Sequence, residues 1–184
     1  MRQVIFVFLF FLFFSSFVLA SEWNIQTITY DGTLLSVATI DIVPESVFFN
    51  ASGNRMYFTG SNKDSVYSYN LTTPWNISTA IYNGNKTTIP QGNNPTGVFF
   101  NASGNRMYVV TTIQIFQYSL STPWDISTAS YGGVNKNIGG QESVATGIFI
   151  DNSGKKMYIA GYTNNSIHSY NLTTAWDLTG ATFD

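Results

Sequence analysis

The sequence predicts an all-β protein built from about three copies of a four-stranded unit. A ten-residue segment at 48–57 returns almost letter for letter at 99–108 and, more loosely, at 149–158. The central glycines of the copies, Gly53, Gly104 and Gly154, lie 51 and then 50 residues apart. A fixed period of this size is typical of a chain that repeats one supersecondary unit. No stretch after the first twenty residues carries a 3.6-residue apolar period, so we expect essentially no helix there.

The first two strands of each copy are predicted from short apolar runs on either side of a Ser-Gly turn. Glycine adopts positive φ at the turn without steric cost, and neighbouring Asn or Ser side chains bond to the local backbone. Two β runs joined in this way predict a hairpin. The paired runs are 46–49 with 56–58, 97–100 with 107–110, and 147–150 with 157–160.

The third strand of each copy is predicted from strict alternation of apolar and polar residues, at 66–71, 115–120 and 167–172. A period of two is the signature of a strand. A Trp-containing link follows, and in the first two copies its proline withholds a backbone donor, which suits a corner. A fourth, weaker strand is predicted at 86–89 and 136–138.

Four short antiparallel strands in about 50 residues are the unit of a β-propeller blade. The pattern Phe-x-x-Ser-Gly-x-x-Met-Tyr, followed by an alternating strand, resembles the hairpin of YVTN/NHL-type propeller repeats. The phrase Pro-Trp-Asp-Ile-Ser-Thr-Ala at 123–129 resembles a repeat of bacterial and viral extracellular propeller-like proteins. The resemblance covers nearly all of 22–184, but Ser52, Ser103 and Ser153 stand where the hairpin usually has Asp. It implies a fold more than a function, because propellers host many activities. A β-solenoid is the main alternative.

Residues 1–20 are predicted to be a secretory signal peptide. Arg2 precedes an apolar run at 4–14, and small residues at Val18 and Ala20 predict cleavage after Ala20. An uncleaved anchor is the alternative, although the apolar run is short for a membrane span. The mature domain is then 21–184, and no later segment is apolar enough to cross a membrane. We therefore expect a secreted or cell-surface protein.

Composition excludes several classes of function. Without Arg2, the chain has seven Lys and Arg against ten Asp and Glu, a net charge of −3. Only 10% of residues are charged, so nothing indicates binding of nucleic acid or of an anionic membrane. The chain has no cysteine, which removes disulfides, thiol chemistry and thiolate metal sites.

The predicted domain contains an orphan fourth strand at 22–43 and repeats at 44–94, 95–144 and 145–184. The last repeat lacks its fourth strand. Three blades form an incomplete propeller, because known rings use about four to eight. Three explanations remain open. Two chains share a six-bladed ring, many chains polymerise by strand donation, or the sequence is part of a longer gene.

No catalytic, cofactor-binding or metal-binding residues are predicted. His168, the single histidine, takes the place of Tyr67 and Phe116 and is interpreted as a ring that fills an aromatic slot. The alternative is a lone base or ligand, but a metal site needs several converging ligands. Asp125 and Asp177 stand where another copy has Asn, which indicates turn capping and not acid–base chemistry.

Two further residue sets are weighed as sites. Trp75, Trp124 and Trp176 are interpreted as packing between blades, with sugar stacking as the alternative. Asn-x-Ser/Thr sequons make candidate N-glycosylation sites in an exported protein, although a chain rich in these residues also makes sequons by chance. The seven candidates are Asn50, Asn70, Asn76, Asn85, Asn101, Asn164 and Asn171.

The sequence thus predicts a secreted or cell-surface scaffold, not an enzyme, that needs no cofactor. Its blades present loops such as 60–64 and 161–165 to a protein or glycan surface, with self-association as a further expectation. One alternative is a structural subunit of an extracellular filament or sheath joined by strand donation. Another is a fragment of a lactonase-like propeller enzyme, which predicts converging acids or histidines.

Overall fold

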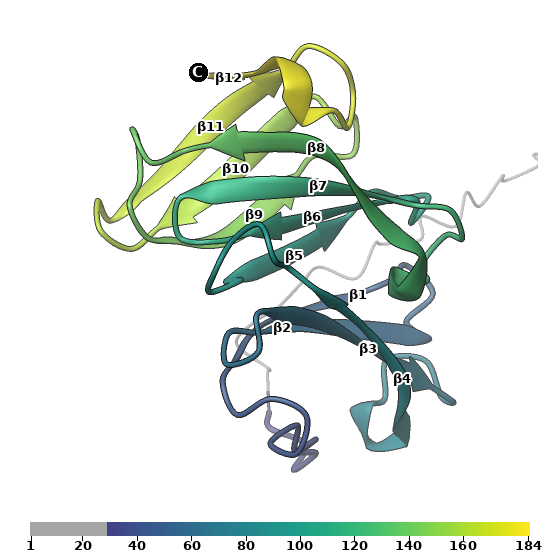
Figure 1. The fold of residues 1–184 in the computed structure, drawn as a ribbon. Coiled ribbons are helices and arrows are strands. Elements are labelled where there is room, and N and C mark those ends of the chain that lie inside the picture. The colour runs from purple at the N-terminus through teal and green to yellow at the C-terminus, as the bar shows by residue number, and fades with distance from the viewer. Residues whose placement is uncertain (1–28) are drawn as a thin grey trace, which may run out of the picture. The chain divides into compact units, whose positions relative to one another are not determined.

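Three four-stranded antiparallel sheets form the fold in the computed structural model, which describes residues 29–184 (Figure 1). Each sheet keeps its strands in chain order, so each is one blade. Blade 1 contains β1 (Pro44–Phe49), β2 (Arg55–Gly60), β3 (Ser65–Leu71) and β4 (Ala80–Thr88). Blade 2 contains β5 (Gly97–Phe100), β6 (Arg106–Val110), β7 (Gln114–Leu120) and β8 (Ala129–Asn137). Blade 3 contains β9 (Ala145–Ile150), β10 (Lys156–Gly161), β11 (Ser166–Leu172) and β12 (Ala181–Phe183).

Helical structure in the described part of the chain is limited to single 3₁₀ turns. These are η2 (Ile77–Thr79), η3 (Ile126–Thr128) and η4 (Leu178–Gly180), one before each outer strand. No helix between residues 29 and 184 is long and apolar enough to cross a membrane. The all-β prediction is confirmed, whereas the predicted signal peptide lies outside the described residues.

The three blades are arranged as an incomplete β-propeller. The first strand of the middle blade, β5, contacts both β1 and β9, and the outer strands β4 and β8 contact the 3₁₀ turn of the following blade. First strands therefore gather on the inside and fourth strands lie outside, as in a propeller. Figure 1 shows blade 1 below, blade 2 in the middle and blade 3 above.

Apolar packing joins successive blades through the same positions each time. Between blades 1 and 2, the buried core contains Tyr57, Val66 and Ile89 together with side chains of β5, β6 and β7. Between blades 2 and 3, the counterparts Tyr108 and Ile115 pack against β9, β10 and β11. Each large side chain buried in this way contributes about 1.5–3 kcal/mol. These cores explain why no disulfide is needed.

The Ser-Gly turn and the Trp link form one structural unit. Trp124 has a positive φ of 66°, which folds its ring back over the turn at Gly104. Its backbone N–H donates to the carbonyl of Gly104 at 2.8 Å. A Cβ atom on Gly104 would overlap the indole ring, and φ there is 68°. Blades 1 and 3 repeat this arrangement, so the turn needs glycine for two reasons, its φ and the indole above it.

A buried hydroxyl fastens each blade to the next. Tyr57 Oη donates to the carbonyl of Trp124 at 2.6 Å, and Tyr108 Oη donates to the carbonyl of Trp176 at 2.6 Å. Burial raises the pKa of both tyrosines above the usual value, so both hydroxyls stay protonated. The Trp link is therefore an interblade acceptor as well as a corner.

The segment before β1 differs from the prediction. An orphan fourth strand was expected over 22–43, but the described part, 29–43, forms no strand. Leu35, Val37 and Ile40 instead pack on the side of blade 1 that faces away from blade 2. No strand of the described chain lies beside this segment, so its backbone has no ladder to join.

Candidate functional site

The hairpin loops between the second and third strands of blades 1 and 3 each have a buried carboxylate beneath them. Asp41 and Glu142 are both 1% exposed. Each lies against the glycine that ends the second strand, Gly60 or Gly161, where a Cβ atom would collide with the carboxylate. Blade 2 has Thr111 at this strand position and no carboxylate. The polar loop end is defined here as these two carboxylates and the loops 60–64 and 161–165 above them.

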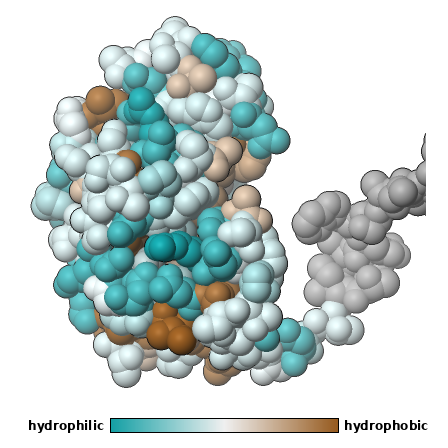
Figure 2. Space-filling view, turned by 90° about the vertical axis from the view of Figure 1, so that its right-hand side faces the viewer, coloured by the Kyte–Doolittle hydropathy of each residue, from teal (hydrophilic) through white to brown (hydrophobic). Residues whose placement is uncertain are grey.

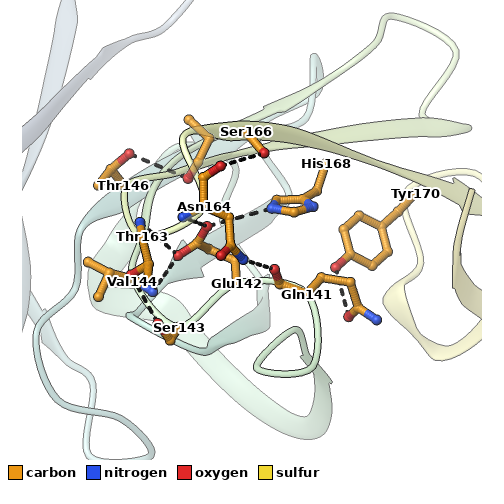
Figure 3. Close-up of polar contacts among 11 residues, drawn as sticks. Gln141, Glu142, Ser143, Val144, Thr146, Thr163, Asn164, Ser166, His168 and Tyr170 are labelled. Carbon is orange, nitrogen blue, oxygen red and sulfur yellow. Dashed lines mark hydrogen bonds and ion pairs between the residues drawn. The ribbon is translucent and has the colours of Figure 1, made fainter.

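Glu142 fastens the loop of blade 3 through backbone donors, as Figure 3 shows. Its Oε1 accepts from the N–H groups of Val144 at 2.8 Å and Thr163 at 3.1 Å, and its Oε2 accepts from Asn164 N–H at 3.3 Å. These bonds lower the pKa of Glu142 to about 2, and the bond from Val144 N–H makes the largest contribution. The carboxylate is therefore ionised at any physiological pH and fixes the loop in place.

Asp41 performs the same task in blade 1. Its Oδ1 accepts from Val43 N–H at 3.0 Å, and its Oδ2 accepts from Lys63 N–H at 3.1 Å. The hydroxyl of Tyr67 also donates to Oδ2 at 3.3 Å. Burial raises the pKa of Tyr67 to about 12, so the phenol remains a donor.

His168 occupies the Tyr67 position in blade 3, as the aromatic-slot interpretation expected. Its Nε2 lies 3.6 Å from Oε2 of Glu142, and this nitrogen is the buried side-chain atom without a hydrogen-bond partner among residues 29–184. Gln141 completes the cluster, because it accepts from Asn164 Nδ2 at 2.6 Å and from Tyr170 Oη at 3.4 Å. Sequence reasoning missed Glu142 and Asp41. The signal that the two share is their place four residues after an apolar residue, Ile138 or Val37.

The chemistry available here is an ionised carboxylate beside an imidazole. The carboxylate is already committed to three backbone donors, so its first role is to hold the loop. In the described residues, no group of three or more His, Cys, Asp or Glu side chains is placed to hold a metal ion.

The turn-capping interpretation of the acidic residues is confirmed. Oδ1 of Asp125 accepts from Ser127 N–H at 3.0 Å, and Oδ1 of Asp177 accepts from Thr179 N–H at 2.9 Å. This bond lowers the pKa of Asp177 below its usual value. Asn76 makes the same bond in blade 1.

The Trp side chains do not share one environment. Trp124 stacks with Phe48 and Tyr57 of the preceding blade, with ring centroids 6.5 Å apart in both pairs, so packing between blades describes it well. Trp75 is 60% exposed. In blade 1 the same residue therefore has no preceding blade in the described chain to pack against.

The sequons also fall into different environments. Asn50 and Asn101 are buried, and their amides donate at 2.7 Å to Asn54 and Asn105, so both are committed to turn structure. The other five candidates are at least partly exposed: Asn70, Asn76, Asn85, Asn164 and Asn171. Glycosylation of these five stays a prediction.

No protein-family model and no curated protein matches the chain. Solved structures resemble it at low identity. A protein from Lactobacillus plantarum is 15% identical with a TM-score of 0.58, over 77% of this chain and 40% of that one. The periplasmic gluconolactonase PpgL of Pseudomonas aeruginosa is 11% identical with a TM-score of 0.53, over 76% and 37%. A protein provisionally named as a 6-phosphogluconolactonase from Bacteroides fragilis is 14% identical with a TM-score of 0.52, over 76% and 39%.

The chain spans about two fifths of the length of these structures. Likeness at this identity shows the fold alone, so the propeller prediction is confirmed and the narrower YVTN/NHL-type assignment stays a prediction. The prediction that the chain is not an enzyme is corrected, because proteins named as gluconolactonases share its fold. The three repeats of this chain contain no complete catalytic set recognisable from sequence. A propeller arranges its blades around a central channel, so one site can draw residues from several blades.

Proposed function

We propose that this chain is an exported propeller module whose polar loop end binds a glycan. The observation that carries the proposal is the pair of buried carboxylates beneath the loops of blades 1 and 3. A loop held by backbone hydrogen bonds from below loses little conformational entropy on binding. Rigid scaffolds that carry exposed loops are the usual setting for recognition.

The exposed side chains of the loop end suit a sugar. Tyr162 is 73% exposed at the tip of the blade 3 loop, and hydroxyl and amide side chains follow it at Thr163 and Asn164. An aromatic face offers a stacking surface for the C–H face of a sugar ring, and the neighbouring polar groups bond to its hydroxyls. The predicted signal peptide and the exposed sequons support an extracellular setting, and the resemblance of the phrase at 123–129 to extracellular propeller-like proteins agrees with it.

Binding to a glycan panel tests the proposal. The full chain is expressed in an exporting host, and its binding is compared with that of Tyr162→Ala and Phe183→Ala. Phe183 is an exposed aromatic residue of the same blade outside the loop, so it serves as a matched control. We expect Tyr162→Ala to weaken binding at least tenfold and Phe183→Ala to leave it unchanged. Binding to no glycan, or equal effects of the two changes, contradicts the proposal.

Lactone hydrolysis is a second candidate function. Several similar structures are named as gluconolactonases, and the unpartnered His168 Nε2 beside ionised Glu142 is the observation in this chain that favours it. In this role the imidazole would act as a base toward water, oriented by the carboxylate. His168→Phe is a gentle test, because Phe116 fills the same slot in blade 2. Loss of δ-gluconolactone hydrolysis with unchanged melting supports this function, and unaffected hydrolysis excludes His168 from it.

A further inference from the structure

Blade 3 exposes apolar side chains whose counterparts are buried in the other blades. Ile167 is 70% exposed, whereas Val66 and Ile115 at the same position are 0% exposed. Phe149 of the inner strand β9 is likewise exposed, although its counterpart Phe48 packs into the core shared with blade 2. We call Phe149, Tyr158 and Ile167 the blade 3 face.

The interblade hydrogen bond is also incomplete on this face. Tyr57 and Tyr108 are fully buried and donate to the Trp carbonyl of the following blade. Tyr158, the third member of the set, is 37% exposed. In the described residues no Trp carbonyl receives its hydroxyl. The blade 3 face therefore exposes the apolar side chains and the tyrosine hydroxyl that the other two blades use to contact the next blade.

Blade 1 has the complementary half at the other end of the stack. An apolar groove, the blade 1 groove, opens on the side away from blade 2. Figure 2 shows hydrophobic patches among polar residues in the lower part of the molecule, where Figure 1 places blade 1. Its principal apolar lining residues are Leu35, Val37, Val47, Phe49, Met56 and Ile77. The corresponding positions of blade 2 receive Tyr57 and Val66 of blade 1.

Segment 33–37 already lies where the outer strand of a preceding blade would lie. Leu35 and Ile77 of η2 pack against the same core cluster and line the same groove, and at the equivalent position of blade 1 Thr87 of β4 bonds to the carbonyl of Ile126 in η3. The turn after this segment matches the turn before blade 3. The N–H groups of Ile40 and Asp41 donate to the carbonyl of Val37, as those of Gln141 and Glu142 donate to the carbonyl of Ile138. The segment thus occupies the position of an outer strand without forming one, and no other strand of such a blade occurs among the described residues.

The third strand of blade 3 has an open outer edge. In blade 1, the fourth strand pairs along all of β3, with Ser65 opposite Thr88 and Tyr67 opposite Lys86. In blade 3, β12 pairs only with Tyr170, Asn171 and Leu172. The stretch 166–168 of β11 therefore has no outer neighbour among the described strands.

We propose that a second copy of the chain docks head to tail, with its blade 1 groove on the blade 3 face. By the repeat register, residues 34–36 of the second copy pair with 168–166 of β11, and Ser36 lies opposite Ser166. Phe149 and Ile167 fill the groove, and Tyr158 donates to the carbonyl of Trp75. Such a heterologous contact closes into a ring if the rotation allows. Two copies make six blades, within the usual range of about four to eight.

Disulfide trapping tests this register, because the chain has no cysteine of its own. Ile89 N–H donates to the carbonyl of Asp64, so the next pair, Ser65 with Thr88, is a non-hydrogen-bonded pair with close side chains. Ser36 and Ser166 correspond to that pair. Full chains with Ser36→Cys and with Ser166→Cys are mixed under mild oxidation. We expect a covalent dimer in the mixture at several times the yield of the control, Ser36→Cys with Ser169→Cys.

Native mass by light scattering is the second measurement. We expect a dimer whose melting temperature rises with protein concentration, and we expect Ile167→Asp to give a monomer that still unfolds cooperatively at a temperature independent of concentration. Longer oligomers that cross-link between 36 and 166 support the docking and replace the closed ring with an open polymer. A monomer at all concentrations, with no more 36–166 cross-linking than the control, overturns the proposal. Glycan binding by such a monomer would leave the proposed function standing.

Discussion

Blade 2 and blade 3 have nearly the same sequence motifs but different surroundings. Blade 2 is covered on both sides by interblade cores, whereas within residues 29–184 blade 3 is covered on one side only. Ile115 and Ile167 occupy the same place in their strands, yet one is fully buried and the other is 70% exposed. Whether a given position of the repeat is buried therefore depends on the neighbouring blade and not on the blade's own sequence. An apolar residue of the repeat is core or interface according to what lies beside it.

The largest expected effect separates these two isoleucines. Ile115→Asp buries an unpaired charge and should cost about 4 kcal/mol or more, enough to abolish cooperative folding. Ile167→Asp should change the stability of the monomer by about 0.5 kcal/mol or less. Urea unfolding followed by Trp fluorescence measures both. Similar losses for the two variants would mean that blade 3 is covered on both sides in the monomer.

A second comparison isolates the contact between turn and indole. Gly104→Ala meets both a positive φ and the ring of Trp124, whereas Gly84→Ala meets a positive φ with open space around it. We expect losses of about 3 kcal/mol for the first and about 1 kcal/mol for the second. Thermal unfolding of the two variants gives the difference. Equal losses would show that the indole moves aside at no cost.

The interblade hydroxyls offer a smaller contrast. Tyr108→Phe removes the donor to the carbonyl of Trp176 and should cost about 1–2 kcal/mol. Tyr158→Phe removes a hydroxyl from an exposed position and should cost nothing measurable in the monomer. Chemical denaturation at low protein concentration checks this pair. A loss at Tyr158 under those conditions would contradict the open blade 3 face.

The smallest expected effect is a difference in the pH dependence of stability between the parent and Glu142→Gln at acid pH. The folded-state pKa of Glu142 is lowered from 4.5 to about 2, so its contribution is full above pH 4.5 and disappears as pH falls toward 2. Glu142→Gln should be less stable than the parent at pH 7 and should lose less stability over that acid range. Glu45→Gln removes the charge of an exposed carboxylate of β1, which accepts from the Ser61 hydroxyl, and is the control. Parallel stability curves for parent and Glu142→Gln would show that the carboxylate does not hold the loop.

The strands were predictable because their signals are local. A Ser-Gly turn with flanking apolar runs, and strict alternation from Val66 to Leu71, define hairpins without any distant contact. The positive φ of Trp124 was not predictable, since it depends on a turn twenty residues earlier. The carboxylates Asp41 and Glu142 were missed because the middle copy has none, which breaks the repeat at that point. The exposure of Ile167 depends on a missing neighbour, which hydropathy alone does not reveal.

Hydrogen exchange along β11 tests the central claim most directly, namely that the blade 3 face binds the blade 1 groove of a second copy. Only the amide of Ile167 faces the open edge, because its counterpart Val66 is in the pair that bonds to the outer strand, so it is compared at low and high protein concentration with the Val66 amide as the internal reference. The account predicts that exchange at Ile167 slows at high concentration toward the rate at Val66. Exchange at Ile167 that stays fast at every concentration, while Val66 remains protected, would contradict it.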